Sequence, residues 1–205
     1  MPGEQLPVPA RAQRADASRN RDEIVRVARA EFDENGVDVP LERIAHLAGV
    51  SRMTLSRHFA DRQELALAIF ETDIQRLHEI AAKWMERPDA CLQFLRAVGD
   101  DCARSLALSE ILVQSASGLE KLSDISRRVI AIARPLLLVS QQNGVLRRDL
   151  TDDDLSIVIG MLLGGTGKDR SEMRAKRGAR VLSLLLEGLL DRTKPEAANY
   201  SHGES

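Results

Sequence analysis

Residues 41–62, LERIAHLAGVSRMTLSRHFADR, decide the fold of the N-terminal part of this chain. Apolar or small residues recur at spacings of three and four over residues 41–48, which predicts a short helix with one buried face. Gly49 suits the backbone conformation that commonly ends a helix, and Ser51 stands where a side-chain oxygen can cap the next helix. The stretch therefore predicts two short helices joined by a tight turn, which is the sequence form of a helix-turn-helix.

The second of these helices is predicted to start near Arg52 and to carry basic side chains on its outer face. Val50, Leu55 and Phe59 form its inward side at steps of four or five residues, so Phe59 is expected in the core. The residues left pointing outward are Arg52, Met53, Ser56 and Arg57. Side chains of these types can reach base edges and phosphates in a DNA major groove.

A third helix is predicted before this pair. Ile24, Val27, Ala28 and Phe32 share one of its faces and can cover the back of the motif, and Gly36 ends it. Three helices then make a small core.

The run from about residue 20 to residue 77 resembles the DNA-binding domain of the tetracycline-repressor (TetR) family of bacterial transcription regulators. The similar segments are EIVRVARAEFDENGVD, IAHLAGVS, TLSRHF and DRQEL, and later GVLRRDLTDDDL and LLLEGLL are similar to the family's dimerisation region. The resemblance implies an all-α fold, with an N-terminal three-helix helix-turn-helix DNA-binding domain and a C-terminal helical ligand-binding and dimerisation domain. It also implies a homodimeric, sequence-specific repressor that a small-molecule effector releases from a near-palindromic double-stranded DNA operator.

The DNA-binding residues are predicted from the recognition segment, from the family positions that match it, and from an upstream arginine. They are Arg21, Ser51, Arg52, Met53, Thr54, Ser56, Arg57, His58 and Arg62. Two of them depart from the family pattern: Ser56 replaces a common aromatic residue, and Met53 stands where Gly or Pro is frequent. Both departures bear on base preference, because a methionine can contact a thymine methyl group.

The roles within this set differ by chemistry. Arg52 and Arg57 can read guanine O6 and N7 bidentately, or can contact phosphates alone. The resemblance makes Thr54 and Arg62 phosphate contacts. His58, near a helix C-terminus, is either a contact or a solvated end residue.

The expected organisation has four parts. Residues 1–18, with Pro2, Pro7 and Pro9, form a flexible arm; residues 19–64 form the DNA-binding domain; residues 65–192 form the helical effector-binding and dimerisation domain; residues 193–205 form a flexible tail. Apolar periodicity in the larger domain predicts helices over residues 62–84, 89–106, 108–116, 119–143, 155–163 and 171–191.

The last predicted helix is apolar on more than one face, which indicates self-association. The dimer interface is predicted at Val158, Ile159, Leu162, Gly178, Ala179, Leu182, Leu185, Leu186 and Leu189. Two-fold symmetry would then place two recognition helices one DNA turn apart.

An apolar or amphipathic effector is expected among the helices of the larger domain. For each residue of its predicted wall, packing in the core is the favoured alternative; the residues are Trp84, Met85, Leu95, Val98, Cys102, Leu112 and Pro135.

Enzyme chemistry is not expected. The segment Gly164-Gly165-Thr166-Gly167-Lys168 lacks the glycine spacing of a phosphate loop, and Asp169 replaces the magnesium-binding hydroxyl residue. The four histidines have no metal-ligand spacing, so neither a metal nor a cofactor is predicted.

The remaining features favour a cytoplasmic protein. The N-terminus lacks the apolar stretch of a signal peptide, and no apolar run approaches the ~20 residues of a membrane span. Cys91 and Cys102 are expected on one helix, ~16 Å apart along its axis and too far apart for a disulfide, so both are predicted to be reduced core residues. The net charge of −2 points to no partner. A helical ligand-binding or scaffold protein whose recognition helix lacks a specific operator is the alternative function.

Overall fold

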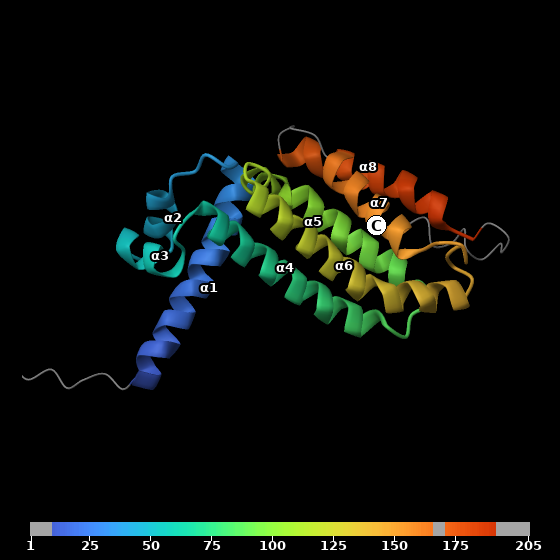
Figure 1. The fold of residues 1–205 in the computed structure, drawn as a ribbon, viewed down its shortest axis with the longest axis horizontal. Helices are drawn as coiled ribbons and strands as arrows, with labels where there is room; N and C mark the ends of the chain where they lie inside the picture. The colour runs from blue at the N-terminus through green and yellow to red at the C-terminus, as the bar shows by residue number, and fades with distance from the viewer. Residues whose placement is uncertain (1–9, 166–170, 192–205) are drawn as a thin grey trace, which may run out of the picture. The chain divides into compact units, whose positions relative to one another are not determined.

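The computed structural model describes residues 10–165 and 171–191, and every helix or strand that it defines in those ranges is an α-helix (Figure 1). The predicted all-α fold is confirmed. Residues 193–205, predicted as a tail, and residues 166–168 of the glycine-rich segment lie outside the described residues. The chain divides into two compact units, Met1–Ile69 and Phe70–Ser205, and this division falls inside a helix, five residues beyond the boundary expected from the sequence.

The first unit contains α1 (Ala10–Asn35), α2 (Leu41–Leu47), α3 (Arg52–His58) and the start of α4 (Arg62–Trp84). α1 packs against both α2 and α3. The face predicted for the helix before the motif is buried as expected, because Ile24, Val27, Ala28 and Phe32 are all in the core. Ile44 and Leu55 are also fully buried, so the apolar periodicity of each short helix is satisfied by the same small core.

A buried carboxylate joins α1 to α2. Glu31 is only 7% exposed and accepts hydrogen bonds from Arg43 Nε at 2.7 Å and from Asn35 Nδ2 at 3.1 Å. Those charged and polar partners satisfy a group that would be costly to bury alone.

The first helix begins earlier than predicted. Residues 10–18, assigned from the sequence to a flexible arm, form the first turns of α1 instead. This segment contains neither proline nor glycine, and its alanine, arginine and glutamine residues have high helix propensity. Asp16 and Arg19 also form an i,i+3 ion pair. The N-terminal part of the predicted arm, residues 1–9, is outside the described residues.

The turn between α2 and α3 depends on Gly49 and Ser51. Gly49 has φ +67°, and the N–H of Val50 reaches back to the carbonyl of Ala45 at 3.0 Å, which closes the end of α2. Ser51 Oγ accepts a hydrogen bond from the backbone N–H of Thr54 at 3.0 Å and so caps α3. Both roles follow the sequence prediction.

Replacing Gly49 by alanine should lower the free energy of unfolding of the first unit by about 1–2 kcal/mol. An alanine Cβ at this site would meet no atom within 4 Å, so the cost comes from the positive φ and not from a clash. Gly49→Asn should cost less, because asparagine tolerates the left-handed region better. Urea unfolding followed by circular dichroism checks both variants, and an equal loss for the two would contradict this explanation.

The second unit is built around α5 (Ala90–Leu112). This helix packs against α6 (Ala116–Gln142), α7 (Asp152–Gly165) and α8 (Ser171–Leu189), as Figure 1 shows. Its buried residues occupy several faces, as expected for a helix covered by neighbours on most sides. Those with at most 1% exposure include Leu92, Phe94, Leu95 and Leu108.

The sequence prediction of two helices between residues 89 and 116 is wrong. α5 continues to Leu112, and a turn at residues 113–115 separates it from α6. Ser115 caps the next helix by accepting a hydrogen bond from the Gly118 N–H at 3.1 Å, so this serine sets the start of α6.

Both cysteines are free and buried, as predicted for reduced core residues. Burial is the main cause that raises the pKa of Cys91 to about 12, and that of Cys102 to about 12. Neither thiol therefore forms an appreciable amount of the reactive thiolate near neutral pH.

Over the described ranges, the helices lack the combination of length and apolar character that crossing a membrane requires.

Candidate nucleic-acid interface and ligand cavity

α3 presents one apolar face to the core and one polar face to the outside. Leu55 is fully buried and Phe59, directly after the helix, is 2% exposed, which confirms Phe59 as a core residue. The residues predicted to point outward do so: Arg52, Met53, Ser56 and Arg57 are all exposed. Their contacts with DNA remain a prediction.

The start of α3 is ordered by its own hydroxyl groups. Ser51 Oγ and Thr54 Oγ1 lie 2.9 Å apart, in addition to the Ser51 cap. Ser51 is exposed and Thr54 half-buried, and both lie at the N-terminus of α3, where backbone N–H groups favour an anion such as a phosphate.

The two arginines of α3 have different surroundings. Arg52 Nε donates to Glu42 Oε1 of α2 at 2.9 Å, and Arg52 Nη1 donates to Ser56 Oγ. Arg57 Nη2 lies 3.9 Å from the Met53 sulfur, a weak acceptor. The sequence carries no signal for Glu42, because its contact with Arg52 joins two helices and follows no helical spacing.

The other predicted basic contacts also have partners within the first unit. The Arg21 guanidinium lies 5.2 Å from the centre of the Phe59 ring. Arg62 is half-buried, donates to the Val39 carbonyl at 2.7 Å and to the Val37 carbonyl, and lies 5.9 Å from the centre of the Phe32 ring. Arg62 therefore stabilises the loop of residues 36–40 before α2, a structural role that the sequence does not predict.

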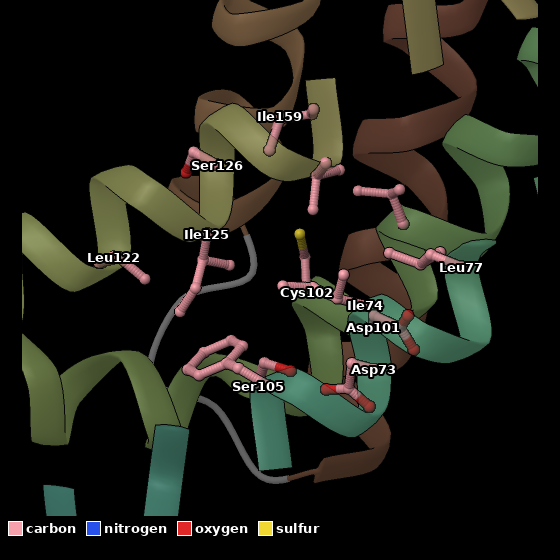
Figure 2. A pocket seen from close by; sticks show the side chains of 13 residues that line it. Asp73, Ile74, Leu77, Asp101, Cys102, Ser105, Leu122, Ile125, Ser126 and Ile159 are labelled. Atoms are coloured by element: carbon pink, nitrogen blue, oxygen red, sulfur yellow. The ribbon is translucent and has the colours of Figure 1, made fainter. Parts of the chain in front are cut away.

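A cavity of about 50 Å³ lies inside the second unit, lined mainly by α4, α5 and α6 (Figure 2). The Cys102 sulfur points into the space flanked by Ile125 and Ile159. The walls are mostly apolar, with acidic and hydroxyl side chains and no basic side chain among the lining residues that the structure describes. Those residues are Phe70, Asp73, Ile74, Leu77, Val98, Asp101, Cys102, Ser105, Leu122, Ile125, Ser126, Val129 and Ile159.

The predicted pocket wall overlaps this cavity only in part. Val98 and Cys102 line the cavity, whereas the other five residues do not. Leu95 and Leu112 are fully buried in the core away from it, and Pro135 is exposed on α6. Trp84 and Met85 lie at the end of α4, beyond its cavity-lining segment.

Ion pairs hold α4 at two points within its cavity-lining segment. Arg128 of α6 donates to Glu71 of α4, with Nη2 and Oε2 2.7 Å apart. Arg76 of α4 pairs with Asp101 of α5, which also accepts a hydrogen bond from Arg104. Asp101 is 6% exposed and is one of the lining residues, so a residue of the cavity wall also holds α4 through its carboxylate.

The predicted dimer interface has to be corrected. Most of its residues, Val158, Ile159, Leu162, Gly178, Leu182, Leu186 and Leu189, are buried within the single chain; only Ala179 is exposed and Leu185 half-buried. The large apolar side chains exposed on the same two helices are Ile157 (54% exposed), Met161 (47%) and Leu184 (52%). Gly160 and Gly188 lie on this exposed side with open space at their Cβ positions. We call these five residues the α7/α8 outer face.

Comparison with known proteins places the helix-turn-helix in a family. Residues 24–69 match the family described as "Bacterial regulatory proteins, tetR family". An HTH-type transcriptional regulator of Staphylococcus aureus (strain USA300) is 39% identical over 62 residues, which are 30% of this chain and 34% of that protein. The match thus spans about a third of the curated relatives' length.

Solved structures resemble more of the chain. The TetR transcription regulatory protein from Mycobacterium vanbaalenii has a TM-score of 0.64 at 26% identity, covering 87% of this chain and 99% of its own. A TetR transcriptional regulator from Streptomyces coelicolor has a TM-score of 0.64 at 28% identity, covering 84% and 99%.

Proposed function

Because the N-terminal domain of this chain is a helix-turn-helix domain of the tetR family, we propose that the protein is a homodimeric, sequence-specific transcriptional repressor released from its operator by a small molecule. The observation that carries the proposal is the α3 surface. It exposes two arginines and the hydroxyl groups of Ser51 and Ser56 on a helix whose N-terminus is capped, and side chains of these types make base and phosphate contacts.

The proposed dimer uses the α7/α8 outer face. Ile157, Met161 and Leu184 leave apolar surface exposed on adjacent helices, and glycines at 160 and 188 would let a second copy approach closely. A two-fold axis through this face would pair two recognition helices, and a near-palindromic operator would match that symmetry.

The proposed effector acts through the cavity of the second unit. Its present volume of about 50 Å³ is far below the roughly 300 Å³ of a small ligand pocket, so a ligand must widen it. Because Phe70, Ile74 and Leu77 of α4 form one wall, widening would displace α4, whose first turns belong to the first unit. Release requires that the effector bind the widened state more tightly than the DNA-bound state.

The lining suggests the chemistry of this effector. Its apolar side chains favour an apolar effector. Mass spectrometry of the protein purified under native conditions, followed by extraction, would identify such a molecule. An extracted molecule that leaves operator binding unchanged when added back would count against its being the effector.

A binding or scaffold protein without a specific operator is the second candidate, since Met53 and Ser56 depart from the family pattern at the recognition helix. Gel shifts with the DNA upstream of the gene, repeated across salt concentrations, separate the two. A repressor should prefer its operator over unrelated DNA by about 10³-fold or more. A phosphate-only binder should show little preference and a steep loss of affinity with salt.

Arg57→Ala should weaken operator binding more than binding to an unrelated duplex. Its guanidinium contacts only the weak Met53 sulfur in the described structure, so it is available for a base edge. Fluorescence anisotropy with both duplexes measures the two affinities. Equal weakening on both would assign Arg57 to phosphate contact and would refute a role in base readout.

A further inference from the structure

Two side chains from different helices hold one arginine of the recognition helix in place. Glu42 Oε1 accepts from Arg52 Nε at 2.9 Å, and Ser56 Oγ accepts from Arg52 Nη1. Glu42 comes from the first turn of α2, whereas Ser56 lies one turn after Arg52 on α3. The guanidinium is therefore fixed from two directions, by groups on two different helices.

These contacts leave the outer end of the guanidinium available. A guanidinium has five N–H groups, of which Glu42 and Ser56 engage one each. Both hydrogens of Nη2 and one of Nη1 remain for a partner outside the chain. Guanine presents two acceptors, O6 and N7, in the major groove, and it is the base that an arginine recognises through two N–H groups.

Holding the arginine in advance favours specific readout. A free arginine side chain loses considerable rotamer entropy when it is fixed on a base, and a side chain already fixed by its neighbours loses less. The Glu42 carboxylate is suited to this task. Hydrogen bonding from its own backbone N–H, and then from Arg52, lowers the pKa of Glu42, so the group is charged at neutral pH.

Arg57 supplies an internal comparison. It lies on the same exposed face of the same helix, but its described contact is the Met53 sulfur at 3.9 Å. The chain therefore restrains one of its two outward arginines with an ion pair and a hydroxyl group, and leaves the other with a weak contact.

We infer that Glu42 and Ser56 are positioning residues that orient Arg52 to read a guanine in each operator half-site. This inference rests on the proposed function. It also explains a serine at position 56, where the family commonly has an aromatic residue. The short serine side chain places its hydroxyl group where Arg52 Nη1 can donate to it. Glu42 supplies specificity even though its negative charge disfavours DNA in general.

The test uses the full-length protein and a half-site preference profile. Duplexes selected from a random pool by the wild-type chain define the operator, and every single base-pair substitution is then measured at constant salt. Arg52→Ala should flatten the preference at one G·C pair, with a loss of about 5- to 140-fold in discrimination. Glu42→Ala and Ser56→Ala should each reduce discrimination at that same pair by several-fold, and leave the other positions unchanged.

Two further variants separate orientation from charge. Glu34→Gln removes the charge of another exposed carboxylate, whose side chain has no described contact with α3, and it should leave the profile unchanged. Glu42→Ala placed on Arg52→Ala should have no further effect at the guanine position, because the group that it orients is already gone. Circular dichroism confirms that each variant is folded.

The outcomes are distinct. Glu42→Ala could strengthen binding to every duplex by the same factor and leave the preference profile unchanged. Glu42 would then only repel DNA through its negative charge, and the inference would be overturned. A profile that survives Arg52→Ala would overturn it as well, while leaving the proposed repressor standing. If the wild-type chain selected no motif, the proposed function itself would fail, and this assignment with it.

Discussion

Replacing Ile157 by aspartate should turn the protein into a monomer and reduce operator binding by about 100-fold or more. Ile157 is 54% exposed on α7. Met161 and Leu184 of the same α7/α8 outer face are also exposed, so no other described part of the chain covers this apolar surface. A charge in the middle of an apolar interface between two copies would have to be desolvated without a partner. A monomer then holds one half-site only and loses the gain from binding two sites at once.

The control for this variant is Leu138→Asp. Leu138 is 53% exposed, like Ile157, but it lies on α6 and not on the α7/α8 outer face. Analytical ultracentrifugation should show a monomer for Ile157→Asp and a dimer for both the wild type and Leu138→Asp. A dimeric Ile157→Asp protein, or a wild type that is monomeric at micromolar concentration, would refute the proposed interface.

The dimer face also shows where sequence periodicity stops being informative. α8 carries leucines on several sides, and the sequence cannot say which of them a neighbouring helix of the same chain will cover. The structure buries Leu182, Leu186 and Leu189 within the chain and leaves Leu184 exposed. The choice depends on where α5 lies, because α5 packs against α8, and that placement is a tertiary fact.

Much more of the first unit than of the dimer face could be predicted from the sequence. Its two short helices, their turn at Gly49, the cap at Ser51 and the buried Phe59 all follow from local chemistry over some twenty residues. What the sequence missed there are contacts between helices. The Glu42 partner of Arg52 and the Arg62 contacts with the loop carbonyls have no local signature, since each joins residues from separate elements.

The cavity was predictable only as a place in the second domain. Its walls come from α4, α5, α6 and α7, and the residues that meet there are far apart in sequence. Apolar periodicity marks Leu95 and Leu112 as inward-facing, but it cannot distinguish a residue that packs tightly from one that borders empty space. The acidic members of the lining, Asp73 and Asp101, carry no apolar signal and were not predicted.

Gly118→Ala should destabilise the second unit by about 3 kcal/mol or more, the upper range for overpacking. Gly118 is in the first turn of α6, and a Cβ built there would lie 2.0 Å from the carbonyl oxygen of Leu112. The Leu112 carbonyl is part of the backbone and cannot change rotamer as a side chain can. The backbone of the turn between α5 and α6 would therefore have to shift. In an open helical site the same change would stabilise by about 1 kcal/mol, so a loss of stability isolates the effect of the contact.

Ser117→Ala is the matched control, because it alters the neighbouring exposed residue in the same turn and should change stability by no more than about 0.5 kcal/mol. Thermal unfolding followed by circular dichroism compares the two variants. A Gly118→Ala protein as stable as the wild type would show that the turn does not approach so closely. The same turn fixes the start of α6, which carries Leu122, Ile125 and the Arg128 partner of Glu71. Because the proposed dimer face on α7 and α8 belongs to the same unit, a partly folded Gly118→Ala protein should lose both its response to the effector and its tight operator binding.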